Sequence, residues 1–96
     1  MAEIQLYRDS NFLGGAVTLT GDETNLSNVN FNDTTSSVIV VSGTFTLYQD
    51  KDFGGWSITV CATGGPDNDG RYPSPSDLGG HNDAITSVRK NSDEPG

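Results

Sequence analysis

The chain repeats itself, and this duplication restricts its fold more than any other feature of the sequence. Residues 7–14 (YRDSNFLG) match residues 48–55 (YQDKDFGG): an aromatic residue, four positions, phenylalanine, one position and glycine recur at an offset of 41. Residues 32–38 match residues 82–88 at an offset of 50, so the second copy carries an insertion between residues 55 and 82. Two similar units, each too small to bury its own apolar face, are expected to pack together as a sandwich.

Short alternating runs predict an all-β chain. Hydrophobic residues make up 32% of the sequence and Gly occurs 12 times, a mixture typical of short strands joined by turns. Alternation predicts strands at residues 3–7, 16–20, 37–41, 44–48 and 56–61 and a last strand through Val88. Their inward residues are predicted to be Ile4, Leu6, Val17, Leu19, Phe45, Leu47, Ile58 and Val60. The fourth strand of each unit is hard to place, with residues 25–28 and the inserted loop as its candidates.

The repeated hairpin motif has a physical explanation. Gly14 and Gly55 can adopt a positive φ, which would let each hairpin fold over sharply. The aromatic residue and the phenylalanine of each motif, Tyr7 with Phe12 and Tyr48 with Phe53, are then expected to pack together.

Charge and composition narrow the range of partners. The net charge of −8 argues against nucleic acid, because phosphate binding needs clustered Lys and Arg. Cys61 is the lone cysteine and reads as a small hydrophobe at the end of a strand. Neither a signal peptide nor a membrane-spanning segment is expected, and the compartment stays open. Residues 1–90 are expected to form one domain, with residues 91–96 as a flexible tail.

Two hydroxyl-rich segments contain the candidate metal ligands. Asn32-Asp33-x-x-Ser36-Ser37 and Asn82-Asp83-x-x-Thr86-Ser87 offer carboxylate, carbonyl and hydroxyl oxygens, the donors that calcium prefers, without His or Cys. One loop cannot supply six to eight ligands, but two loops side by side can exchange them. Such tracts also form ordinary turns. Their duplication, each behind a hairpin motif, favours the metal. The loop pattern of an EF-hand is absent.

With these motifs in the same order, residues 3 to about 90 resemble calcium-binding βγ-crystallin domains of microbes and invertebrates. The resemblance implies two Greek-key motifs, one over about residues 3–41 and one over about 43–90, packed as a β-sandwich with two Ca²⁺ sites at one end. It implies carbonyl ligands from Arg8, Thr34, Gln49 and Ala84, carboxylate ligands from Asp33 and Asp83, and hydroxyl ligands from Ser36 and Thr86. Asn32 and Asn82 would orient the loops, and Ser37 and Ser87 would cap backbone groups. Which hydroxyl pairs with which carboxylate stays open.

Two positions depart from the family pattern. Arg8 stands where an acidic residue is frequent, and its positive charge is expected to weaken one site. Phe45 stands where tryptophan is common, with Trp56 one strand later.

The expected function is calcium-dependent stabilisation, buffering or sensing by a monomer whose protein partners are undefined. One alternative is a structural protein with vestigial affinity. Another is a carbohydrate- or partner-binding module using an exposed Tyr72 and His81 of the inserted loop. An enzyme is not expected, because no nucleophile and base, or pair of acidic groups, can be picked out.

Overall fold

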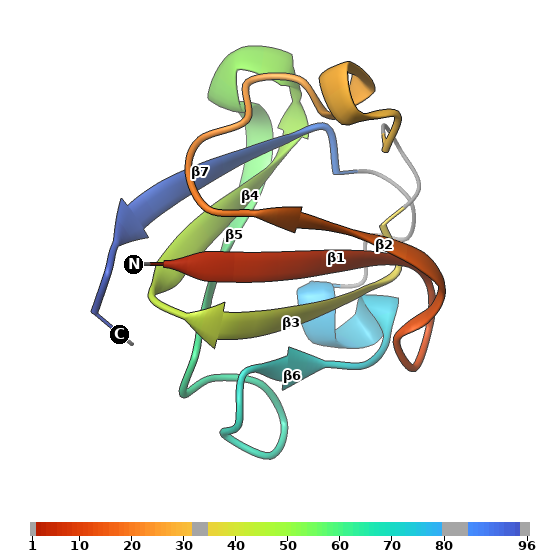
Figure 1. Ribbon diagram of the computed structural model, residues 1–96, viewed down its shortest axis with the longest axis vertical. Coiled ribbons are helices and arrows are strands. Elements are labelled where there is room, and N and C mark those ends of the chain that lie inside the picture. The colour runs from red at the N-terminus through yellow and green to blue at the C-terminus, as the bar shows by residue number, and fades with distance from the viewer. Residues whose placement is uncertain (1, 32–34, 80–84, 95–96) are drawn as a thin grey trace.

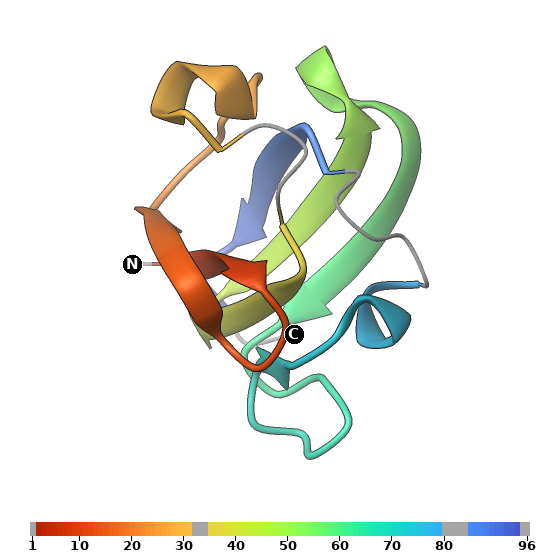
Figure 2. The same ribbon diagram turned by 90° about the vertical axis from the view of Figure 1, so that its right-hand side faces the viewer.

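The computed structural model describes residues 2–31, 35–79 and 85–94, and it shows two antiparallel sheets packed face to face (Figures 1 and 2). One sheet has the order β2-β1-β3-β6 and the other β5-β4-β7. The strands are β1 (Glu3–Asp9), β2 (Leu13–Leu19), β3 (Ser37–Ser42), β4 (Thr44–Asp50), β5 (Gly54–Cys61), β6 (Arg71–Tyr72) and β7 (Ser87–Ser92). Short 3-10 turns are η1 (Leu26–Val29), η2 (Lys51–Phe53) and η3 (Pro75–Leu78). The predicted all-β sandwich is confirmed.

Each half of the chain lends a short segment to the sheet of the other half. β6, from the second half, pairs with β3 of the first through Val38 and Tyr72. In return, Glu23 of the first half forms an isolated bridge with Val88 of β7. These exchanges supply the elements that were hard to place, and the candidate at residues 25–28 was wrong. That segment leads into η1 because the Asn25 side chain accepts a hydrogen bond from the Ser27 N–H and caps the turn.

The core lies between the two sheets. The predicted inward residues Ile4, Leu6, Leu19, Phe45, Leu47 and Val60 are buried, while Val17 and Ile58 are half-buried at its margin. Leu26, Leu78 and Ile85 are added from the connections and are fully buried. The alternation of the strands therefore identified most of the apolar contacts, because successive residues of a strand face opposite sides of the sheet.

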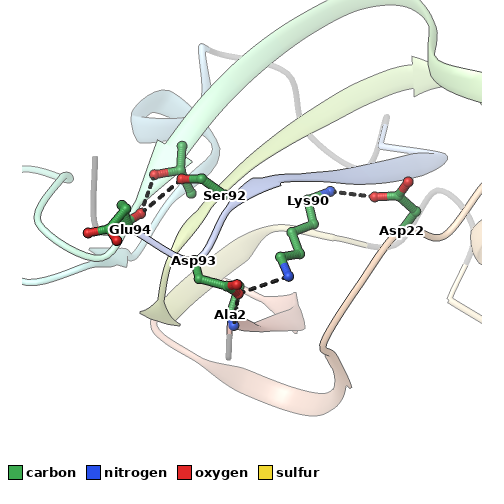
Figure 3. Close-up of polar contacts among 7 residues, drawn as sticks. Ala2, Asp22, Lys90, Ser92, Asp93 and Glu94 are labelled. Atoms are coloured by element: carbon green, nitrogen blue, oxygen red, sulfur yellow. Dashed lines mark hydrogen bonds and ion pairs between the residues drawn. The ribbon is translucent and has the colours of Figure 1, made fainter.

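Residues 91–94 are part of the folded structure, which corrects the predicted tail. Asn91 and Ser92 continue β7, and the Asp93 carboxylate accepts hydrogen bonds from the Ala2 N–H and from Lys90 Nζ, both at 2.8 Å (Figure 3). These donors, Lys90 first, hold the pKa of Asp93 below its usual value. β7 continues to pair with β4 as far as Ser92, four residues past Val88, the last apolar residue of the sequence. Residues 95–96 lie outside the described residues.

Among the described residues no helix has the length and apolar character needed to cross a bilayer.

A buried hydroxyl leads to a prediction about stability. Thr35 is fully buried, and its Oγ1 has no hydrogen-bond partner among the described residues. The position equivalent to it in the repeat is Ile85, which is apolar and also fully buried. Thr35→Val keeps the shape and removes the unsatisfied group, so it should raise the free energy of unfolding by about 1–2 kcal/mol in urea denaturation. Thr20→Val, at an exposed position, is the control; a Thr35→Val variant less stable than its parent would contradict the prediction.

Candidate metal centre

The described residues that adjoin the predicted ligand segments lie at one end of the sandwich. β1 finishes and β3 begins on the right of Figure 1, and β4 finishes and β7 begins near the top of Figures 1 and 2. The antiparallel register pairs Tyr7 with Ser37 and Tyr48 with Ser87. Ser37 and Ser87 are the last residues of the two hydroxyl-rich segments. Arg8 and Gln49 each directly follow the tyrosine that pairs with one of these serines.

Arg8 and Gln49 occupy equivalent irregularities in the sheets. The register of β1 with β2 shifts between Tyr7 and Asp9, and that of β4 with β5 shifts between Tyr48 and Asp50. At each shift two residues of the second strand stand opposite one residue of the first: Gly14 and Gly15 oppose Arg8, and Gly55 and Trp56 oppose Gln49. Such bulges are frequent beside functional sites. The repeat thus takes both residues whose carbonyls are predicted ligands out of regular pairing.

The two hairpins fold over in the same way, and glycine permits it. Gly14 has φ 82° and Gly55 has φ 74°, both in the region that favours glycine. A Cβ at Gly55 would stand 2.7 Å from Gln49 Oε1, and one at Gly14 would collide with the Asp9 carboxylate. Two non-glycine residues of each hairpin tip, a little before the glycine, also have a positive φ: Asn11 and Phe12 in the first copy, Asp52 and Phe53 in the second. The predicted glycine geometry is therefore confirmed in both copies.

The aromatic rings pack as the sequence predicted. The ring centroids of Tyr7 and Phe12 are 5.6 Å apart, and those of Tyr48 and Phe53 are 5.4 Å apart. Both pairs are tilted or edge-on, an arrangement that ring quadrupoles favour.

Ser37 and Ser87 fasten the hairpins to the strands that follow the hydroxyl-rich segments. Ser37 Oγ accepts the Phe12 N–H at 3.0 Å and donates to the Asp9 carbonyl at 2.6 Å. In the second copy, Ser87 Oγ accepts the Phe53 N–H at 3.1 Å and donates to the Asp50 carbonyl at 2.6 Å. Both serines are fully buried. Their hydroxyls are therefore used by the backbone.

Ser36 and Thr86, the predicted hydroxyl ligands, are held by their backbone. The Ser36 N–H donates to the Tyr7 carbonyl at 2.8 Å, and the Thr86 N–H donates to the Tyr48 carbonyl at 2.9 Å. The Thr86 carbonyl also accepts the Leu26 N–H at 2.7 Å. These bonds fix both residues beside the bulges that hold Arg8 and Gln49.

Hydrogen bonds across the two halves tie this end together. The Asn11 N–H donates to the Pro73 carbonyl at 2.7 Å, and the Asp52 N–H donates to the Thr24 carbonyl at 2.8 Å. Each hairpin tip is therefore fastened to the connecting segment of the other half. Two half-sites mounted on such a frame would be held at a fixed separation, which shared ligands require.

The remaining predicted site residues are four ligands and two residues that would orient the loops. Asn32, Asp33, Thr34, Asn82, Asp83 and Ala84 lie outside the described residues. Within the described part of the chain, no three His, Cys, Asp or Glu side chains gather as a metal-binding group. The donors that are placed beside the hairpins, hydroxyls and backbone carbonyls, are hard oxygens and fit calcium.

Sequence reasoning did not find one contact at this end. The Arg8 guanidinium lies 4.6 Å from the centroid of the Phe31 ring, and its Nη2 donates to the Asn30 carbonyl at 3.3 Å. The signal was weak: an aromatic residue stands directly before Asn32, where the second copy has His81.

Comparison with known proteins gives a consistent result. The family model for Beta/Gamma crystallin matches residues 3–90. A beta/gamma-crystallin of Ciona intestinalis is 37% identical over 93 residues, covering 94% of this chain and 99% of the relative. An epidermal differentiation-specific protein of Cynops pyrrhogaster is 35% identical over 94 residues, covering 98% of this chain but only 25% of that longer protein.

Solved structures give the same likeness. The beta gamma crystallin from Ciona intestinalis superposes with a TM-score of 0.82 at 34% identity, covering 93% of this chain and 99% of the other. A betagamma-crystallin from an archaeon has a TM-score of 0.78 at 30% identity, covering 93% and 96%.

Proposed function

Since the chain belongs to the beta/gamma-crystallin family, we propose that it is a calcium-binding domain with two sites at the end of the sandwich where β1 and β4 finish. The proposed ligands are the carbonyls of Arg8, Thr34, Gln49 and Ala84, the carboxylates of Asp33 and Asp83, and the hydroxyls of Ser36 and Thr86.

One observation carries the proposal: the same frame is built twice. In each half a bulge takes one residue out of the ladder, and a hydroxyl-bearing residue is fixed beside it through the N–H bonds of Ser36 and Thr86. The hydroxyl and carbonyl oxygens that the described residues of this frame offer would suit a hard divalent cation. The acidic net charge of −8 favours cation uptake as well.

Calcium bound only to the folded state would stabilise it, so the role of the domain would be calcium-dependent stability, buffering or sensing. We propose that the chain acts in this way as a monomer and without catalysis. Nucleic acid and membrane insertion are not part of the proposal.

The main alternative is a structural domain whose loops have little affinity for calcium. The carbohydrate- or partner-binding alternative is weakened, because Tyr72 was predicted to be exposed and is buried. Its side chain is 6% exposed, its hydroxyl accepts the Cys61 N–H at 3.2 Å, and burial raises its pKa. Tyr72 pairs with Val38 at the edge of the first sheet and belongs to the hydrophobic core. His81 lies outside the described residues.

Calorimetric titration tests the proposal. The chain should take up two Ca²⁺ ions, and Asp33→Ala and Asp83→Ala should each weaken one site by at least tenfold, because each loses a charged ligand. Asp67→Ala, at an exposed position in the inserted loop, removes the same charge and should leave both affinities within a factor of about two. A parent chain that releases no heat with millimolar calcium would favour the structural alternative.

A further inference from the structure

In the loop before β6, at the bottom of Figures 1 and 2, a buried glycine directly follows an exposed aspartate. Gly70 has φ 80°, in the region that favours glycine. A Cβ at this position would collide with the Val40 carbonyl oxygen and stand 3.0 Å from the Ala62 carbonyl oxygen. The fold therefore requires glycine here, and Asp69-Gly70 is the only Asp-Gly pair in the sequence.

An aspartate followed by glycine can modify its own backbone, because glycine has no side chain to shield its nitrogen. The Gly70 nitrogen attacks Cγ of the protonated Asp69 carboxyl, a C–N bond forms, and the carboxyl hydroxyl leaves with the amide proton as water. The product is a succinimide ring. A second water molecule opens the ring at one of its two carbonyls. One opening restores aspartate, and the other gives isoaspartate, whose main chain runs through Cβ and Cγ.

In the folded chain, hydrogen bonds occupy both reacting groups. The Gly70 N–H donates to the Gly64 carbonyl at 2.9 Å. Asp69 Oδ1 accepts the Arg71 N–H at 3.1 Å, and Asp69 Oδ2 lies 3.4 Å from Arg71 Nη1. The Gly70 carbonyl accepts the Val40 N–H at 2.7 Å. Because Arg71 begins β6 and Val40 belongs to β3, the ring can close only when the β6 edge of the sheet opens.

We propose that Asp69-Gly70 is a site of spontaneous isomerisation that the pairing of β6 with β3 suppresses. The rate in the folded chain is then the intrinsic rate multiplied by the fraction of time for which this edge is open. Asp69, Gly70 and the groups that bond them lie outside the hydroxyl-rich segments and the two hairpins. The inference is therefore independent of the proposed calcium sites.

Isomerisation also prevents the edge from closing again. Isoaspartate adds one methylene group to the main chain directly before Gly70, where the Val40 carbonyl leaves no room even for a Cβ. The register that places Tyr72 opposite Val38 would be lost, and with it the position of Tyr72 in the core. Each opening of β6 thus gives the reaction a chance to become permanent. The lifetime of the folded domain is a matter of this rate as well as of equilibrium stability.

Incubation of the full chain at neutral pH, in buffer and in urea, tests the proposal. Peptide mapping by mass spectrometry locates isoaspartate, and enzymatic methylation of isoaspartyl groups counts it. Isoaspartate should form at residue 69 at least about tenfold more slowly in buffer than in urea, which corresponds to a local opening free energy of about 1.4 kcal/mol or more. Asp69→Glu should remove the signal, because closure of the larger ring is much slower. Equal rates in buffer and urea, or isoaspartate mainly at another aspartate, would overturn the proposal.

Two tyrosine variants separate opening of β6 from a general loss of stability. Tyr72→Phe removes the hydroxyl that accepts the Cys61 N–H, so isomerisation in buffer should be about threefold to tenfold faster, while the rate in urea should match that of the parent. Tyr7→Phe is the matched control. It also loses a hydrogen bond, from its hydroxyl to Gln5 Oε1 at 2.9 Å, but it lies in β1 and should change the rate by less than about twofold.

Two outcomes of these measurements decide the role of β6. If Tyr72→Phe isomerises in buffer no faster than Tyr7→Phe, opening of the β6 edge does not control the reaction and the proposal is overturned. The isoaspartate form, separated from the parent by ion exchange, should unfold at a lower urea concentration. An isoaspartate form as stable as the parent would show that β6 still pairs with β3, contrary to the proposal.

Discussion

Calcium at a hundredfold excess over both dissociation constants should stabilise the folded chain by about 5 kcal/mol, since each independent site contributes about 2.7 kcal/mol at that excess. For a domain of this size 1 kcal/mol corresponds to about 4–8 °C, so the melting temperature should rise by about 20 °C or more. Thermal unfolding followed by circular dichroism, in calcium and in EDTA, measures the shift.

The effect of calcium on the melting temperature should be large because the hydrophobic core of so small a domain contributes little stability of its own. Hydrophobic residues make up 32% of a 96-residue chain, and a small domain buries a limited share of its surface. Carboxylates that are brought together to bind a metal repel one another when the ion is absent, and calcium binding would remove this cost.

Two controls make the result specific. Magnesium at equal ionic strength should produce a much smaller shift, because it demands octahedral geometry and gives up its water reluctantly. The double variant Asp33→Ala/Asp83→Ala should lose the calcium shift while still unfolding cooperatively. Superimposed melting curves in calcium and EDTA for the parent chain would argue against the proposed function.

The parts of the fold that repeat locally could be predicted from the sequence. Strand alternation indicated that Ile4 and Leu6 point inward, and the matched motifs indicated how Tyr7 packs with Phe12. The exchange between the halves could not be predicted, because it rests on very short pairings. Glu23 makes a single bridge and β6 has two residues, too few to show an alternating pattern.

The candidate site divides in the same way. Side chains with evident oxygen chemistry, such as Ser36 and Thr86, could be chosen from spacing. The backbone bonds that fix them could not, because the bond from the Leu26 N–H to the Thr86 carbonyl joins residues 60 positions apart and leaves no trace in residue type. Tyr72 was judged exposed from its polar loop, and tertiary packing decided otherwise.

Removing the hydroxyl of Ser37 or Ser87 should cost about 2–4 kcal/mol of unfolding free energy for each variant. Each hydroxyl satisfies two backbone groups, the N–H of a phenylalanine and the carbonyl of an aspartate, at a fully buried position. Alanine would leave both without that partner, and an unsatisfied buried group costs about 1–3 kcal/mol. Urea denaturation of Ser37→Ala and Ser87→Ala gives the values.

Ser57→Ala provides the comparison, because Ser57 is an exposed serine in β5 and its loss should change stability by less than about 0.5 kcal/mol. The two buried serines lie in different sheets, so the double variant should lose about the sum of the single losses. Costs below about 0.5 kcal/mol for both would mean that the hairpins hold their fold without these bonds. If the costs are as expected, each variant should also weaken calcium binding, since the bonded Asp9 and Asp50 carbonyls directly follow Arg8 and Gln49 and fix the bulges that would present the ligand carbonyls.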